Sequence, residues 1–202
     1  APLGPTHEAI EDLAILRTIP NMTVLAPADA DEMRRFMPLT VDHQGPIYIR
    51  LGKGYDPIVS TDDVRVEIGK AIPMRQGKDA LILTTGITLK RGLDAADALR
   101  EHGLDCAVLH LPTIKPLDVD AILGYAAETP VVVTIEEHTV IGGLGSAVAE
   151  VIAEAICAST LAYKNADVRA VLSDEHCDVI MTCIPKLLKL ELPGYVQYLI
   201  GY

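Results

Sequence analysis

The chain has 202 residues, of which 50% are hydrophobic, and its formal net charge at pH 7 is −11. This acidic balance argues against nucleic acid or an anionic membrane surface as the main partner. There is no signal peptide, no apolar run of membrane-spanning length and no Cys-x-x-Cys pair among the four cysteines, so we expect a cytoplasmic protein with reduced thiols.

The first block, residues 1–56, shows alternating helix and strand patterns. Helical spacing of apolar residues and short buried runs predict these elements in chain order: a helix over 8–19, a strand over 22–27, a helix over 29–39 and a strand over 46–52. Asp29, with Glu32 three residues later, is a capping pattern for the second helix. Two strands and two helices cannot close a core. Because the chain also starts without Met, we expect a missing upstream region.

Gly, Pro, Ser and Asp cluster before the second block, and we place a linker at residues 57–66. In the second block, residues 67–202, strands and helices alternate with short connections. The predicted strands cover 79–86, 105–112, 130–137 and 167–173, and the predicted helices cover 87–102, 117–128 and 142–156. This alternation predicts an α/β fold, a three-layer αβα sandwich with a mostly parallel sheet.

Two motifs in the second block invite a functional interpretation. The glycine loop at 142–148, "GGLGSAV", lies between a strand and a helix, but Val148 stands where a dinucleotide fingerprint needs its last glycine. We therefore expect a tight turn and close helix–sheet packing. On a strand, Glu136 and His138 would share one face and Glu137 the other, so only two ligands converge. We expect no metal site there, but solvated charges or a subunit contact.

"IYIRLGKG", residues 47–54, places Arg50 and Lys53 where a buried strand runs into a glycine-flanked loop. Ligands bind at such strand ends in open α/β sheets, and the guanidinium fork suits phosphate. The alternative is an ordinary pair of surface cations on a linker.

Several long motifs, in order, resemble the transketolase family. "GPTHEAIEDLAILRTIPNMTVLAPADADEM" is similar to the second half of the pyrimidine-binding domain of these thiamine diphosphate enzymes. "IGKAIPMRQGKDALILTTG", "PTIKPLD" and "VVVTIEEHTVIGGLGSAVAEVIAE" resemble the transketolase C-terminal domain. The resemblance covers about residues 4–156. It implies a partial pyrimidine-binding domain at 1–56 and a C-terminal domain at 67–202, with the part after about 172 divergent.

By this resemblance, His7 matches the histidine that assists proton transfer at the reacting carbon, and Arg50 matches the arginine that grips the sugar phosphate. Lys53 is a weaker substrate-binding candidate nearby. The resemblance also implies thiamine diphosphate and Mg²⁺ in the full enzyme, although none is expected on this fragment. The implied partners are phosphorylated sugars of the pentose phosphate pathway, an N-terminal transketolase region or subunit, and a second copy in a homodimer.

The chain departs from the family pattern in three places. Leu3 stands where an Asp usually precedes Gly-Pro-Thr-His, no Gly-Asp-Gly occurs, and residues 173–202 match only as a terminal helix and tail. Four alternatives therefore stay open: a non-catalytic dimerisation module, a fragment of 1-deoxyxylulose-5-phosphate synthase, a 2-oxoacid dehydrogenase β subunit, or a nucleotide-binding oxidoreductase domain.

Overall fold

The structure is a computed structural model that describes residues 9–52, 56–61 and 64–163. The chain divides into two units, Ala1–Ala155 and Ile156–Tyr202. The first unit holds all of the described strands and helices except the end of the last helix, residues 156–163. The strand expected over 167–173 lies outside the described residues, and none of the helices in the described part is long and apolar enough to cross a membrane.

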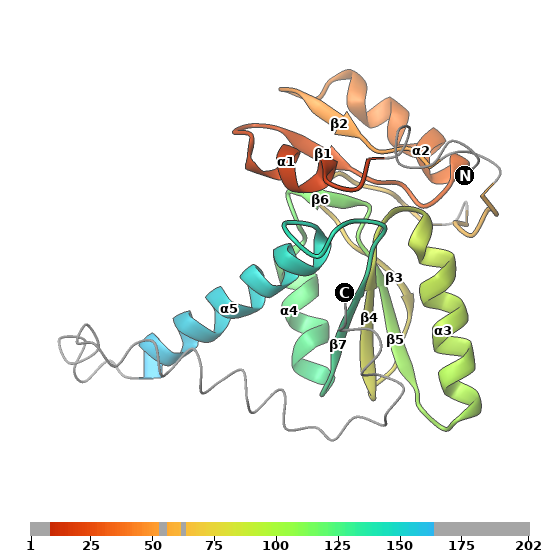
Figure 1. Ribbon diagram of the computed structural model, residues 1–202, viewed down its shortest axis with the longest axis vertical. Coiled ribbons are helices and arrows are strands. Elements are labelled where there is room, and N and C mark those ends of the chain that lie inside the picture. The colour runs from red at the N-terminus through yellow and green to blue at the C-terminus, as the bar shows by residue number, and fades with distance from the viewer. Residues whose placement is uncertain (1–8, 53–55, 62–63, 164–202) are drawn as a thin grey trace. The chain divides into compact units, whose positions relative to one another are not determined.

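The second block forms a four-stranded sheet in the order β3-β5-β4-β7 (Figure 1). Its strands are β3 (Ile72–Arg75), β4 (Ala80–Thr84), β5 (Cys106–His110) and β7 (Val132–Ile135). Strand β4 runs parallel to both β5 and β7, whereas β3 is antiparallel to β5. The predicted mostly parallel sheet is therefore confirmed, with one antiparallel edge strand that the sequence pattern did not predict.

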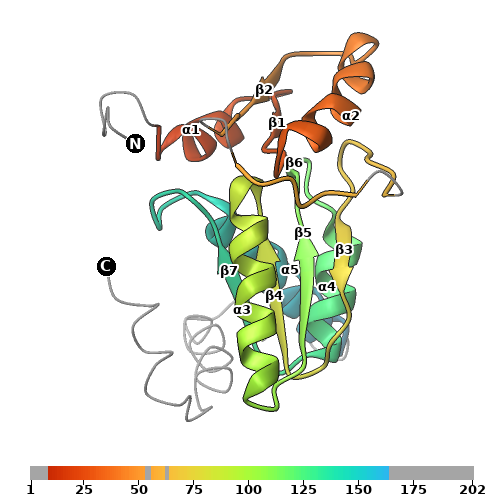
Figure 2. The same cartoon turned by 90° about the vertical axis from the view of Figure 1, so that its right-hand side faces the viewer.

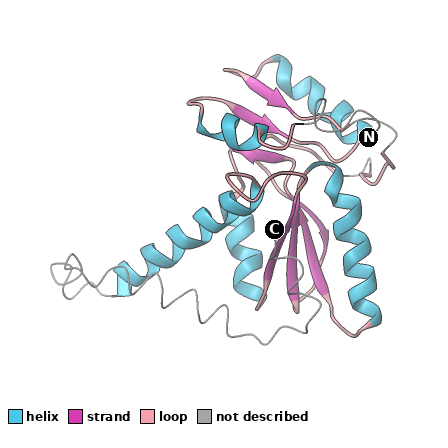
Figure 3. Ribbon diagram, viewed as in Figure 1, coloured by secondary structure: helices cyan, strands magenta, loops and turns pink. Residues whose placement is uncertain are grey.

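Helices cover both faces of this sheet, as Figures 2 and 3 show. They are α3 (Leu89–Glu101), α4 (Val119–Glu128) and α5 (Leu144–Tyr163). Because successive strand residues point to opposite faces, Leu81 packs in the cluster that includes α4 and α5, whereas Ile82 packs in the cluster that includes α3. Both faces of the central strands are thus buried, and the three-layer αβα architecture is confirmed.

The first block forms a separate three-stranded sheet in the order β2-β1-β6. The elements of the first block are α1 (Asp12–Thr18), β1 (Thr23–Leu25), α2 (Ala30–Val41) and β2 (Ile47–Ile49). All four were expected from the sequence. Strand β6 (Thr113–Lys115) comes from the second block and pairs antiparallel with β1. A segment of the second block therefore completes a sheet that the first block cannot build alone.

Local signals set the helix starts. Asp29 accepts a hydrogen bond from the backbone N–H of Glu32 at 2.9 Å, so the predicted cap of α2 is confirmed. Helix α3 starts two residues later than expected, because a 3₁₀ turn, η2 (Gly86–Thr88), precedes it. That turn has its own capping box, in which Thr85 and Thr88 exchange side-chain and backbone hydrogen bonds.

Candidate functional site

Arg50 follows β2 and connects three segments that are far apart in the sequence. Its guanidinium forms a two-pronged ion pair with Asp12 of α1, in which Nε lies 2.8 Å from Oδ2 and Nη2 contacts Oδ1. Nη1 donates to the carbonyl of Glu137 at 2.5 Å, and Nη2 donates to the carbonyl of Ala9 at 3.2 Å. Arg50 therefore holds together the start of α1, the residues before it and the loop after β7.

The electrostatics of this cluster favour a charged pair with a neutral phenol beside it. Burial alone would raise the pKa of Asp12, but hydrogen bonds from Arg50 and Tyr48 and the charge of Arg50 outweigh burial and lower the pKa. The Tyr48 hydroxyl donates to Asp12 at 2.7 Å. Burial and the carboxylate of Asp12 raise the pKa of Tyr48 to about 12, so this hydroxyl keeps its proton.

The sequence predicts three site residues, His7, Arg50 and Lys53, and the structure describes one of them. His7 and Lys53 lie outside the described residues, whereas Arg50 is described and part-buried. Four of the five guanidinium N–H groups of Arg50 already donate to Asp12, Glu137 and Ala9. A phosphate would have to share or displace these acceptors, so its binding by Arg50 stays a prediction. Ala9, which Arg50 contacts, stands only two residues after His7 in the chain.

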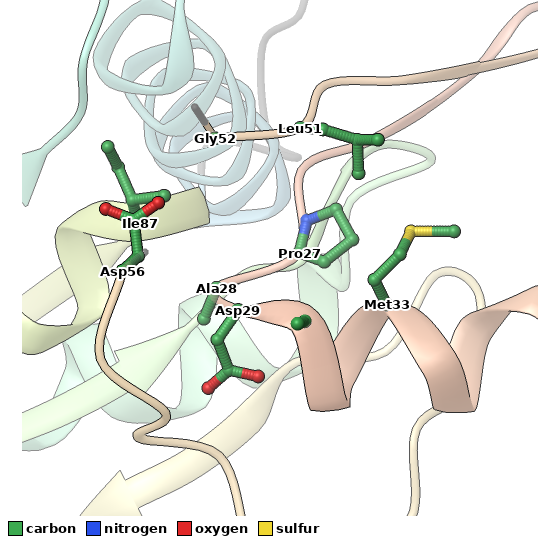
Figure 4. A pocket seen from close by; sticks show the side chains of 9 residues that line it. Pro27, Ala28, Asp29, Met33, Leu51, Gly52, Asp56 and Ile87 are labelled. Atoms are coloured by element: carbon green, nitrogen blue, oxygen red, sulfur yellow. The ribbon is translucent and has the colours of Figure 1, made fainter. Parts of the chain in front are cut away.

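A cavity of about 260 Å³ opens beside the end of β1 and the start of α2 (Figure 4). Its walls are mostly apolar, and the side chains around it are Pro27, Ala28, Asp29, Ala30, Met33, Leu51, Gly52, Asp56 and Ile87. The Asp29 carboxylate is already bound by Ser60 Oγ at 2.6 Å and by the backbone N–H groups of Val59 and Ser60. Burial would raise the pKa of Asp29, but these bonds lower it. We therefore assign this cavity no reactive group.

A second hollow, beside Arg50 and Thr85, has a volume of only about 20 Å³. That is room for roughly one water molecule. This hollow beside Arg50 is therefore too small for a sugar phosphate.

The glycine loop is structural, as expected. Strand β7 ends at Ile135, so Glu136 lies in the following loop, and the expected strand position of residues 136–138 is wrong. The Glu136 carboxylate accepts hydrogen bonds from the backbone N–H groups of Leu144 at 2.6 Å and Gly145 at 2.8 Å. A Cβ on Gly143 would collide with Glu136 Oε2, so only glycine leaves room for this carboxylate. The anion position at the start of α5 is therefore filled by the chain itself.

Sequence analysis missed a buried polar network. His110 is fully buried on β5, where its Nδ1 lies 3.1 Å from Thr84 Oγ1 and its Nε2 lies 3.2 Å from Glu32 Oε2. Glu32 also accepts the backbone N–H of Ala28 at 2.5 Å. An isolated histidine within a strand gives no sequence signal for such a partner, which lies 78 residues earlier. This network joins α2 of the first block to the sheet of the second.

Comparisons with known proteins agree with the motifs. The family model for the transketolase pyrimidine-binding domain matches residues 2–55, and that for the transketolase C-terminal domain matches residues 69–174. A transketolase family protein of Sinorhizobium fredii is 48% identical over 148 residues, which are 72% of this chain and 43% of that protein. One of the subunits of the apulose-4-phosphate transketolase of Phocaeicola vulgatus is 40% identical over 153 residues, which are 75% of this chain and 49% of that protein.

Among solved structures, a split gene transketolase described as an inactive β4 tetramer is 44% identical, with a TM-score of 0.72. The match covers 75% of this chain and 50% of that one. The chain thus spans about half the length, or less, of the relatives it matches.

The described residues do not fit the diphosphate and metal end of thiamine diphosphate. They contain no group of three His, Cys, Asp or Glu side chains that could hold a metal ion. The glycine-flanked helix start, which could have received a phosphate, holds Glu136 instead. The described residues therefore show neither a group of metal ligands nor an open helix start for the diphosphate of this cofactor.

Proposed function

This chain belongs to the transketolase family, and we propose that it is the C-terminal part of an enzyme that transfers a two-carbon ketol unit between phosphorylated sugars. One observation carries the proposal: Arg50, the described candidate residue, contacts Ala9, two residues after His7 of the Gly-Pro-Thr-His motif. The first described residue after this motif and Arg50 therefore meet in space, and Arg50 also contacts Glu137 of the second block.

In this proposal, His7 assists proton transfer at the reacting carbon, and Arg50, with Lys53 as a weaker candidate, binds the substrate phosphate. Residues 1–56 form part of a pyrimidine-binding domain, 57–66 a linker and 67–202 the C-terminal domain. Thiamine diphosphate and Mg²⁺ supply the carbanion chemistry in the complete enzyme. In this proposal an N-terminal region or subunit supplies the metal and diphosphate ligands, which fits the lack of a metal-ligand group among the described residues.

We also propose that the chain associates with a second copy. Several large apolar side chains are exposed just before α1, on α1 and on the loop after β7, namely Ile10, Ile15, Val140 and Ile141. Exposed apolar groups of this size favour association. A solved relative is described as a tetramer of β chains, which supports the same expectation. Sedimentation at tens of micromolar, a typical working range, distinguishes the expected homodimer from a monomer.

A second candidate function is a non-catalytic module that supports a separate catalytic subunit. The observation in its favour is that a solved relative is described as an inactive β4 tetramer. Both candidates predict an inactive isolated chain, so that measurement alone does not separate them.

The separating experiment uses a restored complex, defined as this chain together with the N-terminal transketolase region or subunit that the proposal requires. Ketol transfer is measured with saturating thiamine diphosphate and Mg²⁺, before and after replacing His7 by Ala. An enzyme role predicts a large loss of turnover, typically about 10²–10⁴-fold for a positioned proton-transfer group. Unchanged turnover in His7→Ala would favour the supporting module.

A further inference from the structure

Helix α1 has no cap of its own. The first N–H groups of any helix lack partners within the helix and need acceptors from elsewhere. Glu11, at the N-cap position, makes no side-chain capping bond. Instead, the N–H of Ala14, in the first turn, donates to Nε2 of His138 at 3.3 Å. The acceptor therefore comes from the second block, 124 residues further along the chain.

The two ring nitrogens of His138 have different partners. Nδ1 lies 2.8 Å from the carbonyl oxygen of Thr139, which can only accept a hydrogen bond. Nδ1 must therefore carry the proton in this contact. Nε2 faces the Ala14 N–H and must be the acceptor. Both bonds form together only on a neutral imidazole protonated at Nδ1.

The rest of the loop at 136–142 fastens the same helix. The N–H of Thr139 donates to the carbonyl of Ile10 at 2.9 Å, just before α1. At the other end of the helix, Arg17 Nη1 donates to the carbonyl of Gly142 at 2.8 Å. Gly142 has φ +78°, and a Cβ there would lie 2.6 Å from the Cβ of Ala14, so the loop lies against the helix without space between them. Figures 1 and 2 both show this loop, which follows β7, beside α1.

We propose that His138 is a positioning residue that caps α1 from the second block and so fixes residues 9–11, which lead into this helix. The catalytic consequence rests on the proposed function, because His7 stands two residues before Ala9, which Arg50 also contacts. The capping itself concerns only described residues and is independent of any activity. From the sequence we expect His138 to be a solvated charge or a subunit contact, whereas the structure shows it in contact with α1 of the same chain.

The first test measures hydrogen exchange of the Ala14 amide in the full chain, with three substitutions. His138→Ala removes the acceptor. His138→Asn keeps a polar group near Nδ1 but is too short to reach Ala14, whereas His138→Gln places an amide oxygen close to the position of Nε2. Loss of one such bond should speed Ala14 exchange about tenfold in the Ala and Asn variants, and Gln should restore slow exchange.

The amide of Ala121 is a matched internal control. It lies in the first turn of α4 and donates to the side chain of Asp118, so it reports general loosening of capped helices. His102→Ala is the matched control variant, since the exposed ring of His102, at the end of α3, is bonded to the carbonyl of Ala98 in that helix, far from α1 in the sequence. Unchanged Ala14 exchange in His138→Ala, or equal acceleration of Ala121, would overturn the proposal.

The second test uses the restored complex. Displacement of groups near a reacting centre costs up to about 10²-fold in rate, so we expect kcat to fall about 10- to 100-fold in His138→Ala and His138→Asn, with KM little changed. His138→Gln should recover most of the rate. A Gln variant as slow as Ala would overturn the positioning role. If exchange responds as expected while His7→Ala leaves turnover unchanged, the capping stands and the proposed function fails.

Discussion

The ion pair between Arg50 and Asp12 allows a prediction about stability that can be separated from its predicted role in catalysis. Only 15% of the Arg50 side chain and 9% of the Asp12 side chain are exposed. Removal of one partner from a buried pair costs about 3–5 kcal/mol, because the other charge stays buried without compensation. This pair keeps some contact with solvent, so we expect Arg50→Ala to lower the free energy of unfolding by about 2–4 kcal/mol.

Asp12→Asn should cost less. The variant keeps the shape of the side chain, and Arg50 retains the carbonyls of Glu137 and Ala9 as acceptors. We expect a loss of about 1–2 kcal/mol, close to one hydrogen bond with a charged partner. The double variant should be less unstable than the sum of the single variants, with a coupling energy of about 1–3 kcal/mol.

Urea unfolding of the full chain at pH 7, followed by circular dichroism, measures these differences. With a slope of about 1–3 kcal/mol per molar, Arg50→Ala should lower the unfolding midpoint by about 1–2 M. Arg50→Lys should restore charge but not the two-pronged geometry, and so recover only part of the loss. Strictly additive losses in the double-mutant cycle would show that the pair does not form and would refute the reasoning.

Three further predictions follow from named contacts. The pKa of Asp12 in the folded chain lies below its unfolded value of about 3.9. The stabilisation from Asp12 is therefore complete above that pH and is lost as pH falls through the folded pKa. Urea midpoints should accordingly fall less steeply in acid for Asp12→Asn than for the native chain. Gly143→Ala should displace the Glu136 carboxylate and cost about 1–3 kcal/mol. Gly124→Ala, at an exposed position of α4 with open space around it, should be neutral or stabilising in the same urea assay. In the restored complex, His7→Ala should lower kcat more than it raises KM, and steady-state kinetics with equal effects on both would contradict its place at the reacting centre.

Most elements of the four-stranded sheet and its covering helices were predictable, because their sequence signals are local. Buried runs such as 80–84 and amphipathic helices such as 89–101 follow from the spacing of apolar residues alone. The cap of α2 was predictable for the same reason, since Asp29 and Glu32 stand three residues apart.

The missed strands are short and pair antiparallel with partners far away in the sequence. Strand β6 has three residues before Pro116, too few for a periodic pattern, and it pairs with β1 about 90 residues earlier in the chain. Strand β3 is four residues long and includes a proline, which weakens any strand signal. Their existence depends on tertiary pairing, which a single sequence does not reveal.

The candidate site was only partly predictable. The position of Arg50 at a strand end follows from its local sequence, but its pairing with Asp12 joins residues 38 apart. The bond from Ala14 to His138 likewise depends on how two blocks meet. The position of Arg50 was therefore predictable from the sequence, but its contacts, which occupy most of its N–H donors, were not.

The measurement that tests the central claim most directly is the rate of ketol transfer from a hydroxypyruvate-type donor to a phosphorylated sugar, with saturating thiamine diphosphate and Mg²⁺. The chain alone and the restored complex are compared at equal concentration. If the N-terminal region supplies the metal anchor of the cofactor, as proposed, the chain alone should give no transfer and the complex clear transfer. Transfer by the chain alone, or none by a correctly assembled complex, would contradict the account.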